Sequence, residues 1–173
     1  MKLKTEKLVV VMNILAWISF VGLMIKAGAI LISYCVSIGN PQAAKDLYRG
    51  MDLSVYRDLS FVHYTLLVMY KVILYIMQAY VAFLMTRLLT GLNISRPFNE
   101  GVVKLLQKIS YSILCVGLVA IVYNIHIAIL EKSYGLIATY ISVDFIILSG
   151  IVYVLAQMFK RGVEIQSENE LTI

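Results

Sequence analysis

Four ionisable side chains lie inside long apolar stretches of the sequence: Lys26, Lys71, His126 and Asp144. A charge isolated in a bilayer is costly, so we expect these groups to face inward and to pair. Asp144 is the predicted partner of Lys71, while Lys26 either shares this carboxylate or extends its amine outward along its own stem. Each group lies 16 to 19 residues from the nearest cytoplasmic Lys or Arg, which is about 24–28 Å in a helix. The spacing predicts one polar layer in the outer half of a membrane.

This layer has two interpretations. It is either a structural ion pair that sets the register of the helices, or the proton or ligand site of a small transporter or channel component. A single acid faces two lysines, and the helices lack the Gly or Pro breaks from which transporter sites are built. The sequence therefore favours the structural interpretation and leaves the transporter as the alternative.

The stretches that carry these residues are long enough to span a membrane. The chain has 173 residues, of which 61% are hydrophobic and 14% are charged, whereas charged residues make up about a quarter of a soluble domain. Four apolar stretches, at about 8–32, 61–84, 109–130 and 136–159, each match a hydrocarbon core of about 30 Å. We predict a single-domain all-α membrane protein, a four-transmembrane-helix bundle with up-down topology.

The connections between the spans carry further signals. Short interfacial helices are expected in the 41–60 and 98–108 connections, the second capped by Asn99 with Glu100 in its first turn. Residues 160–173 form a short acidic tail after the fourth span. The first apolar stretch is too long for the core of a cleaved signal peptide, so we expect it to be retained.

The distribution of basic residues predicts the orientation. Nine lysines and arginines lie at the two ends and in the 87–108 connection, and four lie in the other connections. Basic residues accumulate on the cytoplasmic side of membrane proteins. Both termini are therefore expected to be cytoplasmic. The net charge of +5 has the same origin, so direct nucleic-acid binding is not expected.

Signatures of catalysis are missing from the sequence. His63 and His126 lie on different helices without the spacing of a metal site, and no phosphate-binding loop or nucleophile motif occurs. Cys35 and Cys115 are expected near opposite faces of the membrane, too far apart for a disulfide. We expect no enzymatic activity, no cofactor and no metal.

Two motifs carry a resemblance to a known family. Arg96-Pro97-Phe98 precedes the third span, and the chain ends in Phe159-Lys-Arg-Gly162-Val-Glu-Ile-Gln-Ser-Glu168-Asn-Glu-Leu171-Thr-Ile173. This pattern resembles the four-span bacterial membrane proteins of Domain of Unknown Function family 2975, over nearly the whole chain. The sequence departs from the family pattern at Val102, Ile165 and Glu170, where Asn, Leu and Asp are usual.

The resemblance implies a protein of the bacterial cytoplasmic membrane that holds or modulates a small helix-turn-helix DNA-binding regulator. A non-enzymatic regulator or scaffold is thus the first functional hypothesis, and a homo-oligomer is compatible with it. The acidic tail either engages a basic partner or binds the basic 87–108 connection. The expected partner surface combines both motifs: Arg96, Pro97, Phe98, Lys104, Arg161, Gly162, Glu164, Glu168, Glu170, Leu171, Thr172 and Ile173.

Overall fold

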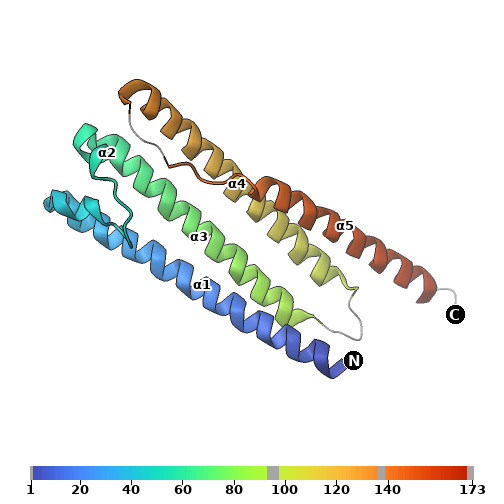
Figure 1. Ribbon diagram of the computed structural model, residues 1–173. Coiled ribbons are helices and arrows are strands. Elements are labelled where there is room, and N and C mark those ends of the chain that lie inside the picture. Colours follow the sequence, from blue (N-terminus) through green and yellow to red (C-terminus); the bar gives the residue numbers. More distant parts are fainter. Residues whose placement is uncertain (1, 93–97, 136–138, 171–173) are drawn as a thin grey trace.

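The computed structural model describes residues 2–92, 98–135 and 139–170, all of whose regular structure is helical. Four of the helices are long and apolar enough to cross a membrane. The elements in chain order are α1 (Lys2–Gly39), the 3-10 helix η1 (Pro41–Lys45), α2 (Ser54–Leu59), α3 (Phe61–Gly91), α4 (Glu100–Tyr134) and α5 (Phe145–Glu170) (Figure 1).

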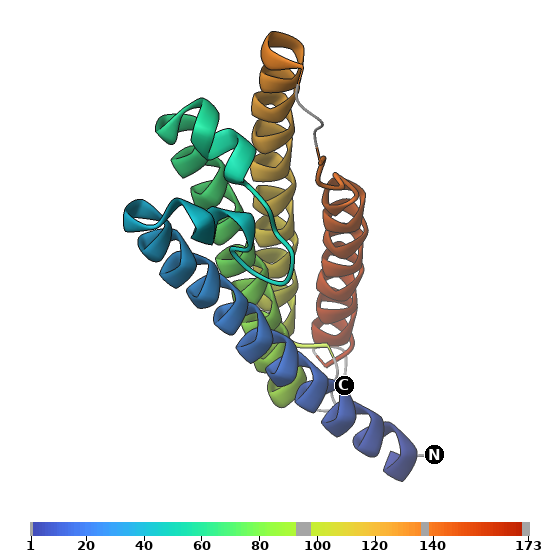
Figure 2. The same ribbon diagram turned by 60° about the vertical axis from the view of Figure 1, so that its left-hand side comes forward.

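The four long helices form an open row. In the described part of the chain α1 packs on α3, α3 on α4 and α4 on α5, and no close approach joins α1 to α5. Figure 2 shows α5 and α1 on opposite outer sides of this row. The four apolar helices are as predicted, and the contacts between them arrange the predicted bundle as this row. Lipid solvates apolar side chains as well as another helix does, so a second face need not be buried.

The helix ends follow local chemistry. Helix α1 ends at Gly39, before Pro41, as the missing donor of proline requires. The predicted cap of α4 is present, because Asn99 Oδ1 accepts the Val102 N–H at 2.9 Å. At the other end of α4, Gly135 adopts a left-handed conformation with φ +67°, which glycine takes at little cost.

The connection between α1 and α3 differs from the surface helix expected there. It contains η1 and α2 separated by an irregular segment, and it is packed into the protein. Leu47, Leu53 and Tyr56 are buried among residues of α1, α3 and α4. Apolar residues recur every four positions at Leu47, Met51, Val55 and Leu59, a pattern that predicts a single helix. The turn at Arg49-Gly50, with positive φ at both residues, interrupts it.

The fourth helix begins later and ends later than predicted. Residues 139–143 are not helical, and α5 starts at Phe145. Asp144 therefore lies at the start of the helix rather than well inside it. At the other end α5 continues through Glu170, so residues 160–170 of the predicted tail are helical.

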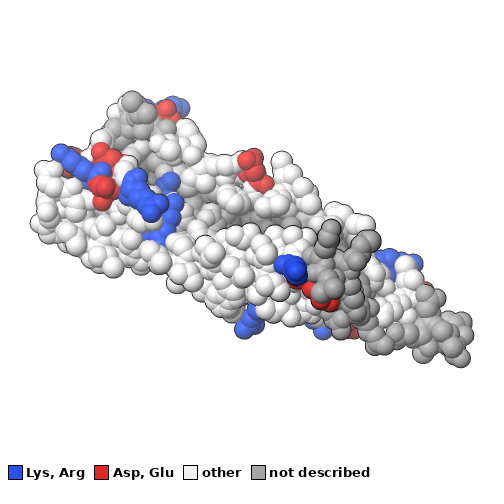
Figure 3. All heavy atoms as spheres, turned by 60° about the horizontal axis from the view of Figure 1, so that its bottom comes forward, with Lys and Arg blue, Asp and Glu red and all other residues white. Residues whose placement is uncertain are grey.

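The largest buried cluster lies toward the end of the molecule that carries η1 and α2. It joins side chains of α1, α3 and α4 to the 41–59 connection. The opposite end holds the start of α1, the end of α3, the start of α4 and the end of α5 (Figures 1 and 2). Figure 3 shows charged side chains gathered toward one end of the molecule and others toward the opposite end, and the large uncharged surface between them carries a few charged groups, one of them acidic. This distribution is typical of a protein that crosses a bilayer.

Candidate functional site

The two lysines of the predicted polar layer contact aromatic rings. Lys71 Nζ on α3 lies 4.7 Å from the ring centre of Tyr123 on α4. Lys26 Nζ on α1 lies 4.3 Å from the ring centre of Tyr75. A ring face attracts a cation, most strongly where water is excluded. These rings thus replace the carboxylate that we expected beside the lysines.

The predicted Asp144–Lys71 ion pair is not formed. Asp144 is exposed, and its carboxylate accepts the Ser142 hydroxyl at 2.5 Å. Because α5 starts at Phe145, the acid lies at the positive end of the helix dipole, which stabilises it locally. The ion pairs of the described residues join neighbours on one helix surface: Glu100 with Lys104, and Arg161 with Glu164.

His126 has a partner that the sequence analysis did not assign. His63 Nδ1 and His126 Nε2 lie 3.1 Å apart, and the His126 ring also contacts Tyr70. The signal was available in the sequence. His63 lies 30 residues before the 93–97 connection and His126 lies 29 residues after it, which places them opposite each other when α3 and α4 pack as a hairpin.

Irregular chain lies beside this polar level on both sides of the row. Ile141 exchanges two hydrogen bonds with the Asn124 side chain, at 2.8 and 2.9 Å, which fixes the segment before α5 against α4. On the other side, Lys26 Nζ lies over the ring of Tyr48 in the η1–α2 connection, 5.7 Å from the centre of that ring. Lys26, Lys71 and His126 are thus linked by the neighbouring rings of α3 and α4 and lie near two non-helical segments, which we call the polar level. Asp144 lies off this level, because the adjacent Ile146 contacts Gly117, nine residues before His126 on α4.

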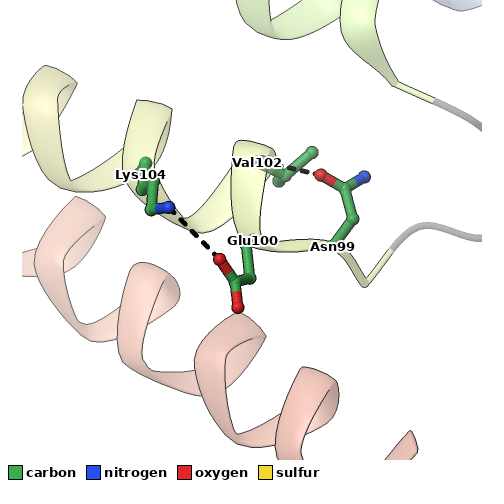
Figure 4. A network of polar contacts seen from close by, with 4 residues as sticks. All are labelled: Asn99, Glu100, Val102 and Lys104. Carbon is green, nitrogen blue, oxygen red and sulfur yellow. Dashed lines mark hydrogen bonds and ion pairs between the residues drawn. The ribbon is translucent and has the colours of Figure 1, made fainter. Parts of the chain in front are cut away.

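A second candidate site lies at the opposite end of the row, between the start of α4 and the end of α5. A groove of about 390 Å³ is lined by Glu100, Val103, Lys104, Gln107, Lys160, Val163 and Glu164. Figure 4 shows its α4 wall, where Glu100 reaches Lys104 at 3.2 Å beside the Asn99 cap. Valines from both helices and a rim of both charge signs give the groove the apolar centre and polar edge of a protein interface.

An aromatic pair closes the same helix junction. The ring centres of Phe98 and Phe159 lie 5.3 Å apart. Gly162 faces the Phe98 ring so closely that a Cβ atom there would lie 2.6 Å from it. Phe98 is nevertheless 42% exposed. An exposed aromatic ring beside a groove is a common anchor for a protein partner.

The predicted partner surface is brought together in part. Phe98, Lys104, Arg161, Gly162 and Glu164 all lie at the α4–α5 junction, and Glu164 is bound to Arg161 at 2.9 Å. Glu168 is exposed on the last turns of α5. Sequence reasoning missed Gln107 and Lys160 as lining residues. The remaining predicted positions lie outside the described residues or side chains: Arg96, Pro97, Glu170, Leu171, Thr172 and Ile173.

Four apolar helices with charged ends define a multi-pass helical membrane protein. The chain belongs to the family of proteins of unknown function DUF2975, whose model matches residues 8–173. This match confirms the family that the Pro-Phe and carboxyl-terminal motifs indicate. No curated protein and no solved structure matches the chain.

Proposed function

We propose that the protein is a non-enzymatic regulator or scaffold of the bacterial cytoplasmic membrane, and that the α4–α5 groove docks a small DNA-binding regulator. The observation that carries this proposal is the groove itself, with Lys104 and Glu100 on one wall and Lys160 and Glu164 on the other. The helix-turn-helix class of the partner comes from the family resemblance. The geometry contributes a surface of suitable size and chemistry for one partner helix.

The charge pattern favours this docking mode. The two lysines and two glutamates of the groove are placed so that a helix lying between α4 and α5 meets both signs of charge. Complementary charges of this kind select a partner and its register more than they add affinity. The exposed ring of Phe98, which contacts Gly162 at the same helix junction, offers an apolar contact next to the groove residues Lys160 and Val163.

The groove faces the cytoplasm in the proposed orientation, with both termini on that side and the four helices crossing up and down. Basic residues at the two chain ends and in the 87–108 connection outnumber those of the other connections by nine to four, as the rule for cytoplasmic loops requires. The groove lies at the end of the row where α1 starts and α5 ends (Figures 1 and 2).

The polar level of Lys26, Lys71 and His126 then marks the outer boundary of the hydrocarbon layer. Backbone that is not helical does not lie exposed to lipid within that layer, because its polar groups lack partners there. The irregular segments 46–53 and 139–143 adjoin this level. The 16 to 19 residues between this level and the cytoplasmic basic residues span about 24–28 Å, close to the thickness of the layer. The parts of α1, α3 and α4 beyond it extend outside the membrane.

The transporter alternative receives less support. It uses a site built from Lys71 and Asp144, and Asp144 instead binds Ser142 at the start of α5. Lys71 lies over Tyr123 and has no acid within ion-pair distance among the described residues.

The test is co-purification from the native cell in a mild detergent, followed by identification of the bound soluble proteins. We expect a small DNA-binding protein with the wild type. The variant Lys104→Glu with Lys160→Glu should lose it, because both lysines of the groove reverse their charge. Lys132→Glu, the same change at the other end of α4, should retain it.

The helical circular dichroism of the purified variants shows whether each one folds. Loss of the partner from a folded groove variant alone supports the proposal. Recovery of the same partner with the wild type and the folded groove variant contradicts docking in the groove. The absence of any DNA-binding protein from the wild-type sample contradicts the regulator function itself.

A further inference from the structure

A second cavity lies at the opposite end of the row from the groove. It has a volume of about 400 Å³ and is lined by Lys26 of α1 and by Tyr48, Arg49, Gly50 and Met51 of the η1–α2 connection. It opens at the polar level that we place at the outer boundary of the hydrocarbon layer. We call it the outer cavity.

Two cations meet at one ring in this cavity. Lys26 Nζ lies 5.7 Å from the ring centre of Tyr48, and Arg49 Cζ lies 5.5 Å from the same centre. Like charges that lie this close to one ring repel each other, and Arg49 remains exposed. The ring offsets part of this repulsion, but a bound anion between the cations would remove much more of it.

The acids of the same connection are engaged elsewhere. Asp46 accepts the backbone N–H of Gly50 at 2.8 Å, and Asp52 accepts the backbone N–H of Ser54 at 2.8 Å. Among the described residues, neither Lys26 nor Arg49 has a carboxylate within ion-pair distance. The cavity therefore presents two positive charges without an internal counter-ion.

The backbone of Arg49 is held in an unfavourable conformation. Its φ is +46°, and the next residue, Gly50, has φ +84°. A non-glycine residue at positive φ is uncommon and persists only where its surroundings impose it. Here the Asp46 bond closes the turn, and the turn places the guanidinium beside the Tyr48 ring.

We propose that the outer cavity binds the phosphate of an anionic lipid headgroup. Lys26 and Arg49 provide the charge, and exposed apolar side chains of α1 on the membrane side of Lys26 provide a surface for the acyl chains, among them Val21, Met24 and Ile25. The lipid is favoured over a free phosphate because the cavity adjoins this apolar surface. The inference rests on the membrane position proposed above, and is independent of any partner in the groove.

The experiment measures binding of lipid to the full chain in a mild uncharged detergent by native mass spectrometry. The probes are phosphatidylglycerol, phosphatidylcholine with the same acyl chains, and glycerol phosphate as the soluble source. Each basic residue near an anionic lipid contributes about fivefold in affinity. Lys26→Gln with Arg49→Gln should thus weaken phosphatidylglycerol binding by roughly thirtyfold, while Lys132→Gln should leave it unchanged.

A second variant separates binding from folding. Arg49→Gly removes the cation and also relieves the backbone, because glycine adopts positive φ freely. We expect it to unfold at the same temperature as the wild type or a higher one, and still to bind phosphatidylglycerol about fivefold more weakly. Wild-type affinity for this lipid in the double variant and in Arg49→Gly would overturn the proposal.

Two further outcomes identify the source of the anion. Glycerol phosphate that competes as well as the lipid would overturn the lipid assignment, and equal affinity for phosphatidylcholine would overturn the role of the charge. The membrane position is read separately, from the labelling of Cys35 described below. If Cys35 is labelled as expected but phosphatidylglycerol binds no better than phosphatidylcholine, the lipid-binding inference is contradicted and the membrane position is not.

Discussion

The contact between Gly117 of α4 and the first turn of α5 allows a quantitative prediction. Gly117 is buried, and a Cβ atom there would lie 2.8 Å from Ile146 Cγ1 and 3.4 Å from the Ile146 backbone nitrogen. Gly150 also lies within a long helix, but a Cβ atom there would have no neighbouring atom within 4 Å. The two glycines thus test the same substitution with and without a close neighbour.

The expected magnitudes follow from two opposing effects. Gly→Ala within a helix gains about 1 kcal/mol from helix propensity. Overpacking a tight contact costs about 1–3 kcal/mol. We therefore expect Gly150→Ala to raise the free energy of unfolding by about 1 kcal/mol. The free energy of unfolding of Gly117→Ala should be about 1–3 kcal/mol lower than that of Gly150→Ala.

The assay is far-ultraviolet circular dichroism during titration of mixed micelles with a denaturing detergent. Ile146→Ala provides the control, because it removes the Cγ1 atom that lies closest. In that background Gly117→Ala should change the free energy of unfolding as Gly150→Ala does. Equal stabilisation by both substitutions in the wild-type background would refute the close packing of α4 and α5.

Three further predictions concern the outer end. In intact cells a membrane-impermeant maleimide should label Cys35 of α1, beyond the polar level, and should not label Cys115, which lies within the hydrocarbon layer; both thiols are exposed on the protein surface. Labelling from outside at Cys115 alone would contradict the proposed position. Asp144→Leu and Lys71→Met should lower the free energy of unfolding additively, within about 0.5 kcal/mol in a double-mutant cycle, because the two side chains do not pair. A larger coupling energy would show that they form an ion pair and would contradict this part of the structure. Burial, with a smaller effect of a nearby acid, raises the pKa of Tyr56 above its usual value of 10.0. The unfolded state therefore releases this proton first, so stability should fall as the pH rises above about 10, and the fall in an alkaline denaturation series should be smaller in Tyr56→Phe.

The four long helices could be predicted because lipid requires about 20 apolar residues for each crossing. Their arrangement in a row could not, since an apolar side chain that faces lipid and one that faces a neighbouring helix look alike in sequence. The cap of α4 could also be predicted from the sequence. Asn99 stands before an amphipathic stretch with Glu100 behind it, and the structure uses it as expected.

The start of α5 shows where hydropathy misleads. Residues 136–143 are as apolar as a span, but Asn124 binds the backbone of Ile141 and holds it outside any helix. Such a side-chain contact from another helix is not visible in local sequence. This contact places Asp144 at the start of α5, away from Lys71, for which it was the predicted partner. The His63–His126 contact, by contrast, follows from their equal distance from the α3–α4 connection.

Site-specific photo-crosslinking in living cells tests the docking proposal most directly. A crosslinking amino acid replaces Gln107, which lines the groove, or Lys132 at the other end of α4 as the control. We expect an adduct with a small DNA-binding protein from position 107 and none from position 132. No adduct with such a protein at position 107, or the same adduct at both positions, would contradict docking in the α4–α5 groove.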